Sequence, residues 1–393
     1  MQMSKLLIKN VKMIDSSMDF EGDLLIENGK ISKIDSNINP TDIEGLKIID
    51  GKNKILMPAF IDLHTHLRDP GLTHKEDLET GQKAALKGGF TVLCPMANTK
   101  PVCDNEQVME YVLSKAKKLN LCDIKQVCAI TENLEGEEII DIEKMRTYTD
   151  LFSDDGYTLH NEKIMRDALS LSKKLDFKVL THCQPEFEIV KRDLNMLKEV
   201  GGNLHICHIS LKDTLHEIKK YKNDGYKFTC EVGPHHIFGY GLEYRVNPAF
   251  AEEEDMKHLI QGIKDGYIDM IGTDHAPHTK EDKEKGAPGI SNIEVAFQMV
   301  NKVFNENNIS LNKLSEMMSA NPAKLLGLNQ GLIKEGLRAD LVIVDSEQEE
   351  VIDVSKFVSK GKNNPFDGQK VRGKIIMTIR DGRVMYDVKG DIQ

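Results

Sequence analysis

Residues 62–71 read Asp-Leu-His-Thr-His-Leu-Arg-Asp-Pro-Gly and place His64, His66 and Arg68 at every second position. The segment follows an apolar run that is typical of a buried strand. In an extended chain alternate side chains share one face, so these three are expected to point the same way. Imidazole nitrogens are common zinc ligands, and an arginine fork matches a carboxylate. The pattern therefore predicts a metal site beside a group that binds an anion.

Other apolar runs also end in polar residues that could join this site. They lead to Asn98, to the turn Asp154-Asp155-Gly156, to His182, to His208 and to the segment Asp274-His275-Ala276-Pro277-His278. Neutral imidazoles and carboxylates are the usual non-sulfur ligands of zinc. Four imidazoles and two carboxylates exceed one tetrahedral shell. This excess favours two ions that share a bridging carboxylate and hydroxide, although the sequence leaves one or two metals open.

Each of these signals has a structural explanation when it is taken alone. A single histidine at a strand end is more often a hydrogen-bonded core or rim residue than a ligand, and Asp-Asp-Gly alone indicates a turn. The combination favours a metal site, because the separate explanations would all have to hold at once. We expect structural positions for the remaining histidines, namely His74, His160, His205, His216, His235, His236, His258 and His275, and a solvated loop for Lys280 to Lys285.

The elements that carry these residues alternate along the middle of the chain. Helical patterns separate most of the apolar runs, for example at Glu76 to Leu86, Glu162 to Lys174, Leu211 to Tyr221 and Glu254 to Lys264. Such alternation over roughly 250 residues predicts a (β/α)8 TIM barrel, whose active site lies at the C-terminal ends of the strands. The eight predicted strands are Ala59 to His64, Phe90 to Cys94, Ile124 to Ile130, Leu151 to Ser153, Phe177 to His182, Leu204 to His208, Lys227 to Val232 and Ile268 to Thr273.

Both ends of the chain differ from this middle and are rich in short strand patterns. At the N-terminal end, Glu27-Asn28-Gly29-Lys30 is a hairpin signal between two apolar segments. At the C-terminal end, two strand patterns surround Asp381-Gly382. We therefore expect one small composite β-sandwich domain from residues 1–56 and 329–393, and a barrel from residues 57–328.

The composition excludes some classes of partner. The formal net charge is -11 and no long run of lysine or arginine occurs, which argues against binding to nucleic acid or to an anionic membrane surface. The seven cysteines form no Cys-x-x-Cys pair, so we expect reduced core thiols. With no signal-peptide pattern and no apolar run long enough to cross a bilayer, the predicted location is cytoplasmic.

The motifs together resemble the class I dihydroorotases, a branch of the cyclic amidohydrolases. The resemblance runs from about Ile8 to about Tyr386. Its most specific parts are residues 62–71, Asn98-Thr99-Lys100-Pro101, residues 152–156, Cys207-His208-Ile209-Ser210, Asn247-Pro248 and residues 273–278. It implies a metal-dependent hydrolase barrel with a composite β domain.

The resemblance also implies a role for each site residue. The metal ligands would be His64, His66, Asp155, His182, His208 and Asp274, with Asp155 as the bridging ligand where other amidohydrolases use a carboxylated lysine. Asp274 would also act as general base and then acid. Arg68, Asn98 and His278 would hold the substrate carboxylate, and Asn247 with the backbone near Pro288 and Gly289 would contact the ring amide groups.

Some residues depart from the pattern of the family. Ala97 stands in Met96-Ala97-Asn98-Thr99 where proline is usual, and His182 is followed by Cys-Gln-Pro-Glu where Cys-Glu-Asp is common. The stretch between His182 and His208 is shorter than in many relatives, because this chain lacks a helical insertion there. These departures leave every expected ligand in place.

The implied reaction is the reversible, zinc-dependent hydrolysis of L-dihydroorotate to N-carbamoyl-L-aspartate, whose ring-closing direction serves de novo pyrimidine (UMP) biosynthesis. Arg68 favours this substrate class, because hydantoinases and allantoinases share the His-x-His pair but lack this arginine. Two alternatives stay open: a hydantoinase-like or allantoinase-like cyclic amidase, and a scaffold homologue that has lost catalysis. A homodimer is the expectation from base rates. Association with aspartate transcarbamoylase, known for some relatives, is left open.

Overall fold

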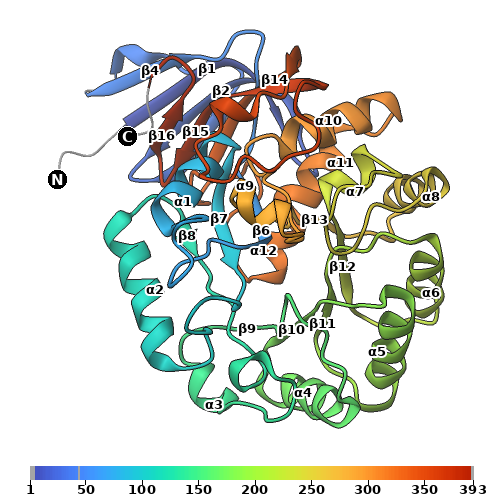
Figure 1. The fold of residues 1–393 in the computed structure, drawn as a ribbon. Coiled ribbons are helices and arrows are strands. Elements are labelled where there is room, and N and C mark those ends of the chain that lie inside the picture. The colour runs from blue at the N-terminus through green and yellow to red at the C-terminus, as the bar shows by residue number, and fades with distance from the viewer. Residues whose placement is uncertain (1–4, 43–44, 391–393) are drawn as a thin grey trace.

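The computed structural model describes residues 5–42 and 45–390, and it brings the two ends of the chain into one sheet. This eight-stranded sheet has the order β16-β15-β14-β5-β1-β2-β3, and β4 also pairs with β1. Figure 1 shows the early strands in blue and the late strands in red within one layer. Its strands are β1 (Lys5–Ile14), β2 (Asp19–Glu27), β3 (Lys30–Asp35), β4 (Leu46–Asp50), β5 (Ile55–Pro58), β14 (Leu341–Val351), β15 (Lys370–Arg380) and β16 (Arg383–Asp387).

Local turn chemistry and apolar side chains hold this sheet together. Asn28 and Gly29 both have positive φ, of 53° and 75°, and they connect β2 to the antiparallel β3 as the sequence predicted. Ile8 and Leu24 from the first strands pack in one buried cluster with Leu341 from β14. Apolar contacts between strands more than 300 residues apart therefore join the two ends.

The middle of the chain forms two parallel sheets. One contains β6 (Phe60–Thr65), β7 (Phe90–Pro95) and β8 (Asp123–Ile124). The other contains β9 (Leu151–Phe152), β10 (Lys178–Thr181), β11 (Leu204–Ile206), β12 (Thr229–Val232) and β13 (Met270–Ile271). Each strand overlaps one of the eight that the sequence predicted, although most are shorter.

Isolated parallel bridges connect these two sheets at both edges. Cys128, beyond β8, pairs with Phe152 of β9, and Thr65 of β6 pairs with His275, beyond β13. The backbone N–H of His66 also donates to the carbonyl of His275 at 2.9 Å. The pairings thus run around a circuit in which the last parallel strand returns to the first.

One buried cluster draws a side chain from most strands of this circuit. It contains Leu63, Cys94, Met96, Val127, Leu151, Leu180, Cys207 and Met270, and Leu325 and Leu326 pack against it. Contributions from strands all around the circuit are the pattern of a filled barrel interior. Cys207 therefore lies inside the circuit.

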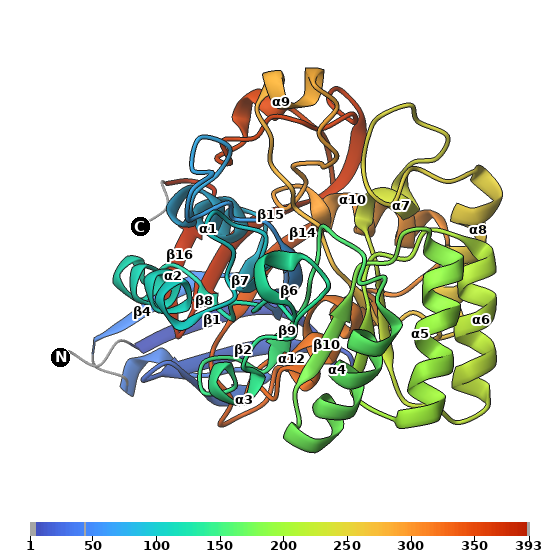
Figure 2. The same cartoon turned by 60° about the horizontal axis from the view of Figure 1, so that its bottom comes forward.

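Helices surround the parallel strands, and Figure 2 shows α4, α5 and α6 along the outside. Asp77 caps the N-terminus of the first helix and accepts from the backbone of Glu79 and Thr80. The helices are α1 (Leu78–Lys87), α2 (Glu106–Leu119), α3 (Ile142–Met145), α4 (Glu162–Leu175), α5 (Glu186–Val200), α6 (Lys212–Asn223), α7 (Pro234–Phe238), α8 (Glu253–Lys264), α9 (Lys280–Glu284), α10 (Ala296–Glu306), α11 (Leu311–Ser315) and α12 (Asn321–Leu325). The four helices expected from the sequence correspond to α1, α4, α6 and α8.

Three local expectations differ from the structure. The strand β6 ends at Thr65, and Arg68 has a left-handed φ of 60°, so extended alternation does not reach Arg68. The regular part of β8 ends at Ile124, although the backbone N–H groups of Lys125 and Val127 still donate to the carbonyls of Leu93 and Pro95. Residues 280–284 form α9 where a loop was expected.

None of the described helices combines the length and the apolar character that a transmembrane span requires.

Candidate active site

A cavity of about 620 Å³ opens where the parallel strands end. Apart from His64, which is fully buried beneath it, all the site residues expected from the sequence line this cavity. They are His66, Arg68, Asn98, Asp155, His182, His208, Asn247, Asp274, His278, Pro288 and Gly289. The neighbouring wall includes Leu134 and Tyr157, which the sequence analysis did not single out.

The side chains reach this cavity from the ends of different strands. His64 lies in β6, whereas Asp155, His182, His208 and Asp274 follow β9, β10, β11 and β13 within three residues. His208 and Asp274 have positive φ, of 34° and 46°. The backbone leaves the extended form at these two residues, so the turn after each strand orients the ligand.

Asp155 lies at the centre of the candidate metal ligands. Its Oδ1 is 3.2 Å from His64 Nε2, 3.4 Å from His182 Nδ1 and 3.5 Å from His208 Nε2. Its Oδ2 is 3.4 Å from His66 Nε2. The ligand atoms form two overlapping groups, one with His64 and His66 and the other with His182 and His208. The shared carboxylate is suited to bridge two cations.

The unsatisfied atoms at the centre of this cluster fit a metal ion. His64 Nε2 and Asp155 Oδ1 are buried and have no hydrogen-bond partner within the described part of the chain. Buried polar atoms without a partner are costly, which points to a ligand. Neutral imidazoles with carboxylates are also a donor set that zinc prefers.

The charges around His64 and Asp155 favour a cation at this position. Burial lowers the pKa of His64, but the Asp155 carboxylate outweighs it, so this pKa lies well above its usual value. Burial raises the pKa of Asp155, but the charge of His64 and the neighbouring imidazoles hold it well below the usual range. The Asp155 carboxylate therefore stays ionised and stabilises positive charge at the centre of the cluster.

His66 links Asp274 to Asn98. The Nδ1 of His66 is 2.9 Å from Asn98 Oδ1, and its Nε2 is 3.1 Å from Asp274 Oδ1. The amide oxygen can only accept, so Nδ1 carries a proton, and Nε2 is the nitrogen that faces Asp274 and the metal cluster. Asn98 thus orients a candidate ligand in addition to lining the cavity.

The pKa of Asp274 favours its ionised form. Burial raises this pKa, but the hydrogen bond with His66 and the charges of the surrounding histidines lower it well below its usual range. An ionised carboxylate at the cavity wall can bind a cation or accept a proton.

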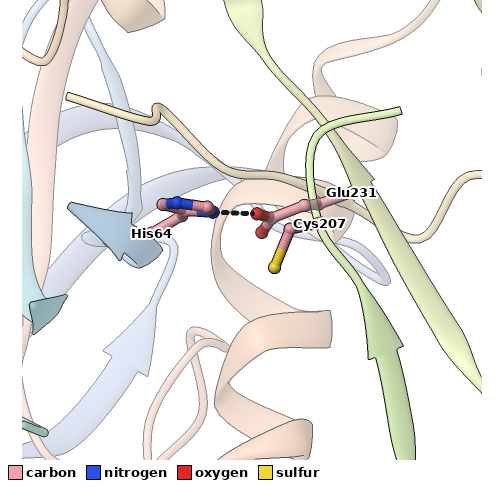
Figure 3. A group of neighbouring side chains, drawn as sticks. All are labelled: His64, Cys207 and Glu231. Carbon is pink, nitrogen blue, oxygen red and sulfur yellow. Dashed lines mark hydrogen bonds and ion pairs between the residues drawn. The ribbon is translucent and has the colours of Figure 1, made fainter. Parts of the chain in front are cut away.

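Glu231 is a buried carboxylate that the sequence analysis missed. It lies in β12, is 1% exposed, and accepts from His64 Nδ1 at 2.9 Å (Figure 3). Figure 3 also shows the Cys207 thiol beside this pair. A lone carboxylate inside the apolar strand pattern of residues 227–232 was the signal available in the sequence.

The adjacent carboxylates Asp154 and Asp155 take different directions. Asp154 Oδ1 accepts from the backbone N–H groups of Ile130 and Thr131, at 2.7 and 3.0 Å, and its Oδ2 accepts from the Thr131 hydroxyl at 2.5 Å. Asp155 faces the histidines. Asp154 therefore ties two strand ends together, and Asp155 is the member of the pair that can hold a metal.

Arg68 and His278 form the anion-binding part of the cavity. An Nη of Arg68 donates to His278 Nε2 at 3.1 Å, and its Nε donates to the carbonyl of Pro277 at 3.3 Å. Burial and the nearby Arg68 charge lower the pKa of His278 to about 3, so its imidazole is uncharged near neutral pH. Burial lowers the pKa of Arg68 to about 10, which leaves the guanidinium charged. One fixed positive charge thus lies beside a neutral imidazole.

A further part of the cavity wall is formed by Asn247, Pro288 and Gly289. The N–H of Gly289 donates to the carbonyl of Arg245, and its carbonyl accepts from Asn363 Nδ2. The polar backbone atoms of Gly289 are therefore already used, and the Pro288 carbonyl is the group at this turn better suited to accept from a ligand.

Lys283 on α9 supports the same turn. Its Nζ donates to the carbonyls of Arg245, Ala287 and Gly289, at 2.8, 2.9 and 3.0 Å. Burial lowers the pKa of Lys283 to about 8. The segment expected to be a solvated loop is thus a short helix that stabilises one wall of the cavity.

Several of the histidines given structural roles are buried near the site. His205 Nε2 is 3.2 Å from Glu231 Oε2, and His275 Nε2 is 3.7 Å from Glu76 Oε2. His236 Nε2 donates to the carbonyl of Pro248 at 3.1 Å, next to Asn247. These contacts agree with structural roles and connect the histidines to the residues that line the cavity.

Comparisons with known proteins agree with this geometry. The model of the Amidohydrolase family matches residues 55–385. A dihydroorotase of Clostridium botulinum (strain Eklund 17B / Type B) is 43% identical, over 97% of this chain and 99% of that protein. A dihydroorotase of Aquifex aeolicus (strain VF5) is 38% identical, over 98% of this chain and its full length.

The fold is also similar to solved structures. An L-hydantoinase (dihydropyrimidinase) from Arthrobacter aurescens superposes with a TM-score of 0.90 at 25% identity, covering 99% of this chain and 97% of that one. A D-hydantoinase structure superposes with a TM-score of 0.87 at 22% identity, covering 99% and 96%. The sequence similarity to the dihydroorotases is higher than that to these hydantoinases.

Proposed function

We propose that this chain, which belongs to the amidohydrolase family and within it to the dihydroorotases, interconverts L-dihydroorotate and N-carbamoyl-L-aspartate. In the hydrolytic direction one water opens the ring at an amide bond, and in the reverse direction the same water is released. The observation that carries the proposal is the position of Arg68, in one cavity with the histidine and aspartate cluster. Arg68 supplies a charge that matches the carboxylate of this substrate.

We propose zinc as the metal, held by His64, His66, Asp155, His182, His208 and Asp274. The donor set and the unsatisfied atoms at its centre support this choice. When bound, zinc lowers the pKa of a water ligand towards neutrality and polarises a carbonyl oxygen. The six donors suit two ions with Asp155 between them.

In this proposal Asp274 carries the proton during ring opening. Its ionised carboxylate takes a proton from the attacking water and passes it to the ring nitrogen as the amide bond breaks. His66, 3.1 Å from Asp274 Oδ1, keeps the carboxylate directed towards the cavity. In ring closure the same group moves the proton in the opposite direction.

Substrate orientation is assigned to the other residues of the cavity. Arg68, with Asn98 and His278, would hold the carboxylate and so fix the ring relative to Asp274. Asn247 and the Pro288 carbonyl would contact the ring amide groups. Gly289 would shape this wall, because its own backbone atoms are already bonded.

We further propose that the circuit of parallel strands is a (β/α)8 barrel of residues 57–328, and that residues 1–56 and 329–393 form a composite β domain. The bridges at both edges of the parallel sheets support closure. The terminal sheet includes β5, which ends at Pro58, and the parallel strands begin with β6 at Phe60, which supports a change of unit close to residue 57. A second layer that would make the composite domain a sandwich stays a prediction, as do the homodimer, the aspartate transcarbamoylase contact and the cytoplasmic location.

The second candidate function is a hydantoinase-like cyclic amidase, which the structural similarity to hydantoinases favours. The buried charge of Arg68 argues against it, because hydantoin has no carboxylate to neutralise that charge. A scaffold that has lost catalysis is disfavoured by the complete set of metal donors.

A single preparation of purified protein can test this proposal. Its metal content and its hydrolysis of dihydroorotate, hydantoin and allantoin should be measured on the same sample. We expect stoichiometric zinc and a much higher kcat/KM for dihydroorotate than for either uncharged ring. Preference for hydantoin would support the cyclic amidase, and a metal-free, inactive preparation would support the scaffold.

A further inference from the structure

A chain of buried polar groups extends from the candidate metal ligand His64 into the barrel interior. Glu231 Oε1 is 2.9 Å from His64 Nδ1, and Glu231 Oε2 is 3.2 Å from His205 Nε2. His205 Nδ1 is in turn 2.8 Å from the hydroxyl of Thr229. His64, His205 and Glu231 are at most 1% exposed. None of these four residues is among those that line the cavity, and His64 is the one nearest to it through its contact with Asp155.

This arrangement determines which nitrogen of His64 carries a proton. An ionised carboxylate can only accept, so His64 Nδ1 donates to Glu231, and Nε2, which faces Asp155, is the nitrogen available to a metal. His205 lies against the other carboxylate oxygen, and its Nδ1 is paired with the Thr229 hydroxyl. Glu231 therefore accepts one imidazole proton from His64 and has a second imidazole beside its other oxygen. Such an outer carboxylate orients a metal-binding histidine and raises its basicity.

The neighbouring strand leaves space for this carboxylate. A Cβ at Gly272, just after β13, would lie 2.3 Å from Glu231 Oε2. Any larger residue at position 272 would displace the carboxylate from His64 and His205. The position of Glu231 is thus fixed by its hydrogen bond with His64, by the contact with His205 and by the absence of a side chain at position 272.

The Cys207 thiol gives this cluster the appearance of a separate metal site. His64, Cys207 and Glu231 offer three potential ligand atoms within 4.8 Å of one another. However, His64 Nδ1 is occupied by its hydrogen bond to Glu231, and the other nitrogen of the same ring faces Asp155. The cluster has the chemistry of a hydrogen-bonded support and lacks the chemistry of a second cation site.

We propose that Glu231 is a positioning residue that sets the metal affinity of the active site by holding His64 in the Nδ1–H tautomer, with His205 and Thr229 fixing Glu231 in turn. The inference rests on the proposed function, because it assumes that His64 binds the metal. Glu231 also adds a buried negative charge close to the cations.

The test compares two substitutions of Glu231 with a matched buried carboxylate elsewhere. Glu231→Ala removes the acceptor, whereas Glu231→Gln keeps an oxygen that can accept from His64 and loses the charge. Asp23→Asn is the control, because Asp23 is 2% exposed and accepts from backbone N–H groups in the terminal sheet. Zinc affinity should be measured by competition with a chelator, together with urea unfolding of the metal-free proteins.

We expect Glu231→Ala to weaken zinc binding by about 10- to 100-fold, the usual effect of losing such a partner. Glu231→Gln should show a smaller loss, and Asp23→Asn should bind zinc like the parent protein. The KM for dihydroorotate should stay close to the parent value in metal-saturated Glu231→Gln, because Glu231 does not line the cavity. A role in stability alone would lower the unfolding free energy without this loss of affinity.

Parental zinc affinity in the Gln variant, or in a folded Ala variant, would overturn the proposal. The Gln variant decides the matter if Glu231→Ala does not fold. Cys207→Ser should keep the parental number of zinc ions, and loss of one ion would identify the cluster as a metal site instead. If the parent protein itself bound no metal, the proposed function would fail, and the inference about Glu231 would fail with it. If the parent bound zinc and the Glu231 variants bound it equally well, only the inference about Glu231 would fail.

Discussion

Asp274 is a candidate metal ligand that contacts both the histidine cluster and the open cavity. Its Oδ1 lies 3.1 Å from His66 Nε2 and 3.7 Å from His64 Nε2, and its side chain reaches the cavity from the turn after β13. It can therefore contact both the metal cluster and a substrate. Asp155 contacts the cluster from its centre and is surrounded by imidazoles, so it is less free to exchange a proton.

Asp274→Asn should give a folded protein with very low turnover. The amide cannot accept the proton of the attacking water, so kcat should fall by about 10²- to 10⁴-fold, the usual contribution of a general base. Steady-state hydrolysis of dihydroorotate with bound zinc quantified on the same sample measures this effect. Near-parental kcat at full zinc occupancy would remove Asp274 from its proposed role.

Arg68→Ala should mainly weaken substrate binding. A buried hydrogen-bonded charge contributes about 1.5 to 3 kcal/mol, which corresponds to a rise in KM of roughly 10- to 100-fold. Hydantoin lacks the carboxylate, so its hydrolysis should change less and the preference for dihydroorotate should narrow. Arg68→Lys is the matched control, since it keeps the charge without the fork. An unchanged ratio of the two kcat/KM values would contradict the assignment of Arg68.

At the scale of the element, the end of β9 gives two adjacent aspartates opposite functions. Asp154→Ala leaves the N–H groups of Ile130 and Thr131 without their acceptor and should lower the unfolding free energy by about 2 to 4 kcal/mol. Within the described residues, the Asp155 side chain accepts no hydrogen bond from a backbone N–H group. Asp155→Ala should therefore lower the unfolding free energy less than Asp154→Ala does, but it should abolish stoichiometric zinc binding. Urea unfolding of the metal-free variants and zinc titration measure the two effects. Equal effects of the two substitutions on both quantities would show that the pair acts as one unit.

The strand ends also show what the sequence could predict at this scale. Most of the apolar runs were predicted to end in polar residues, and the candidate site residues among these, other than His64, line one cavity because parallel strands end at the same edge. The direction of each side chain was predicted less well. Extended alternation stops at Thr65, and Arg68 and Asp274 have a left-handed backbone. Such conformations are not encoded by a period of two.

Glu231 illustrates a second limit of the sequence. Its partners His64 and His205 come from two other strands, so no local spacing relates the three residues. A charged residue inside an apolar strand indicates a buried partner, but it does not identify that partner. The pairing becomes visible only when the strands are placed side by side.

At the scale of the whole molecule, the chain encloses several neutral imidazoles beside the cavity. Burial lowers the pKa of His236 to about 4, and burial with Arg68 lowers that of His278 to about 3. His236 is 3% exposed and donates to the carbonyl of Pro248, next to Asn247. Because the folded protein resists protonating these groups and the unfolded chain does not, the stability of the whole fold depends on pH.

The sign of this dependence follows from the two pKa values of His236. Its pKa is near 6.5 in the unfolded chain and about 4 in the fold, so between these values the unfolded chain binds more protons. The contribution to stability is complete above the unfolded value and is lost as the pH falls towards 4. Between about pH 7.5 and about pH 5 the loss amounts to about 2 kcal/mol for this one group.

His236→Gln should therefore flatten the pH profile of stability. The glutamine amide can still donate to the Pro248 carbonyl but does not titrate, so the metal-free variant should lose about 2 kcal/mol less than the parent between about pH 7.5 and about pH 5. Urea unfolding at both pH values measures the difference, and His258→Gln at an exposed position of α8 is the control for loss of one histidine. Parallel profiles for the parent and His236→Gln would mean that His236 titrates alike in the folded and unfolded chains, and the origin of acid sensitivity would then lie with other groups.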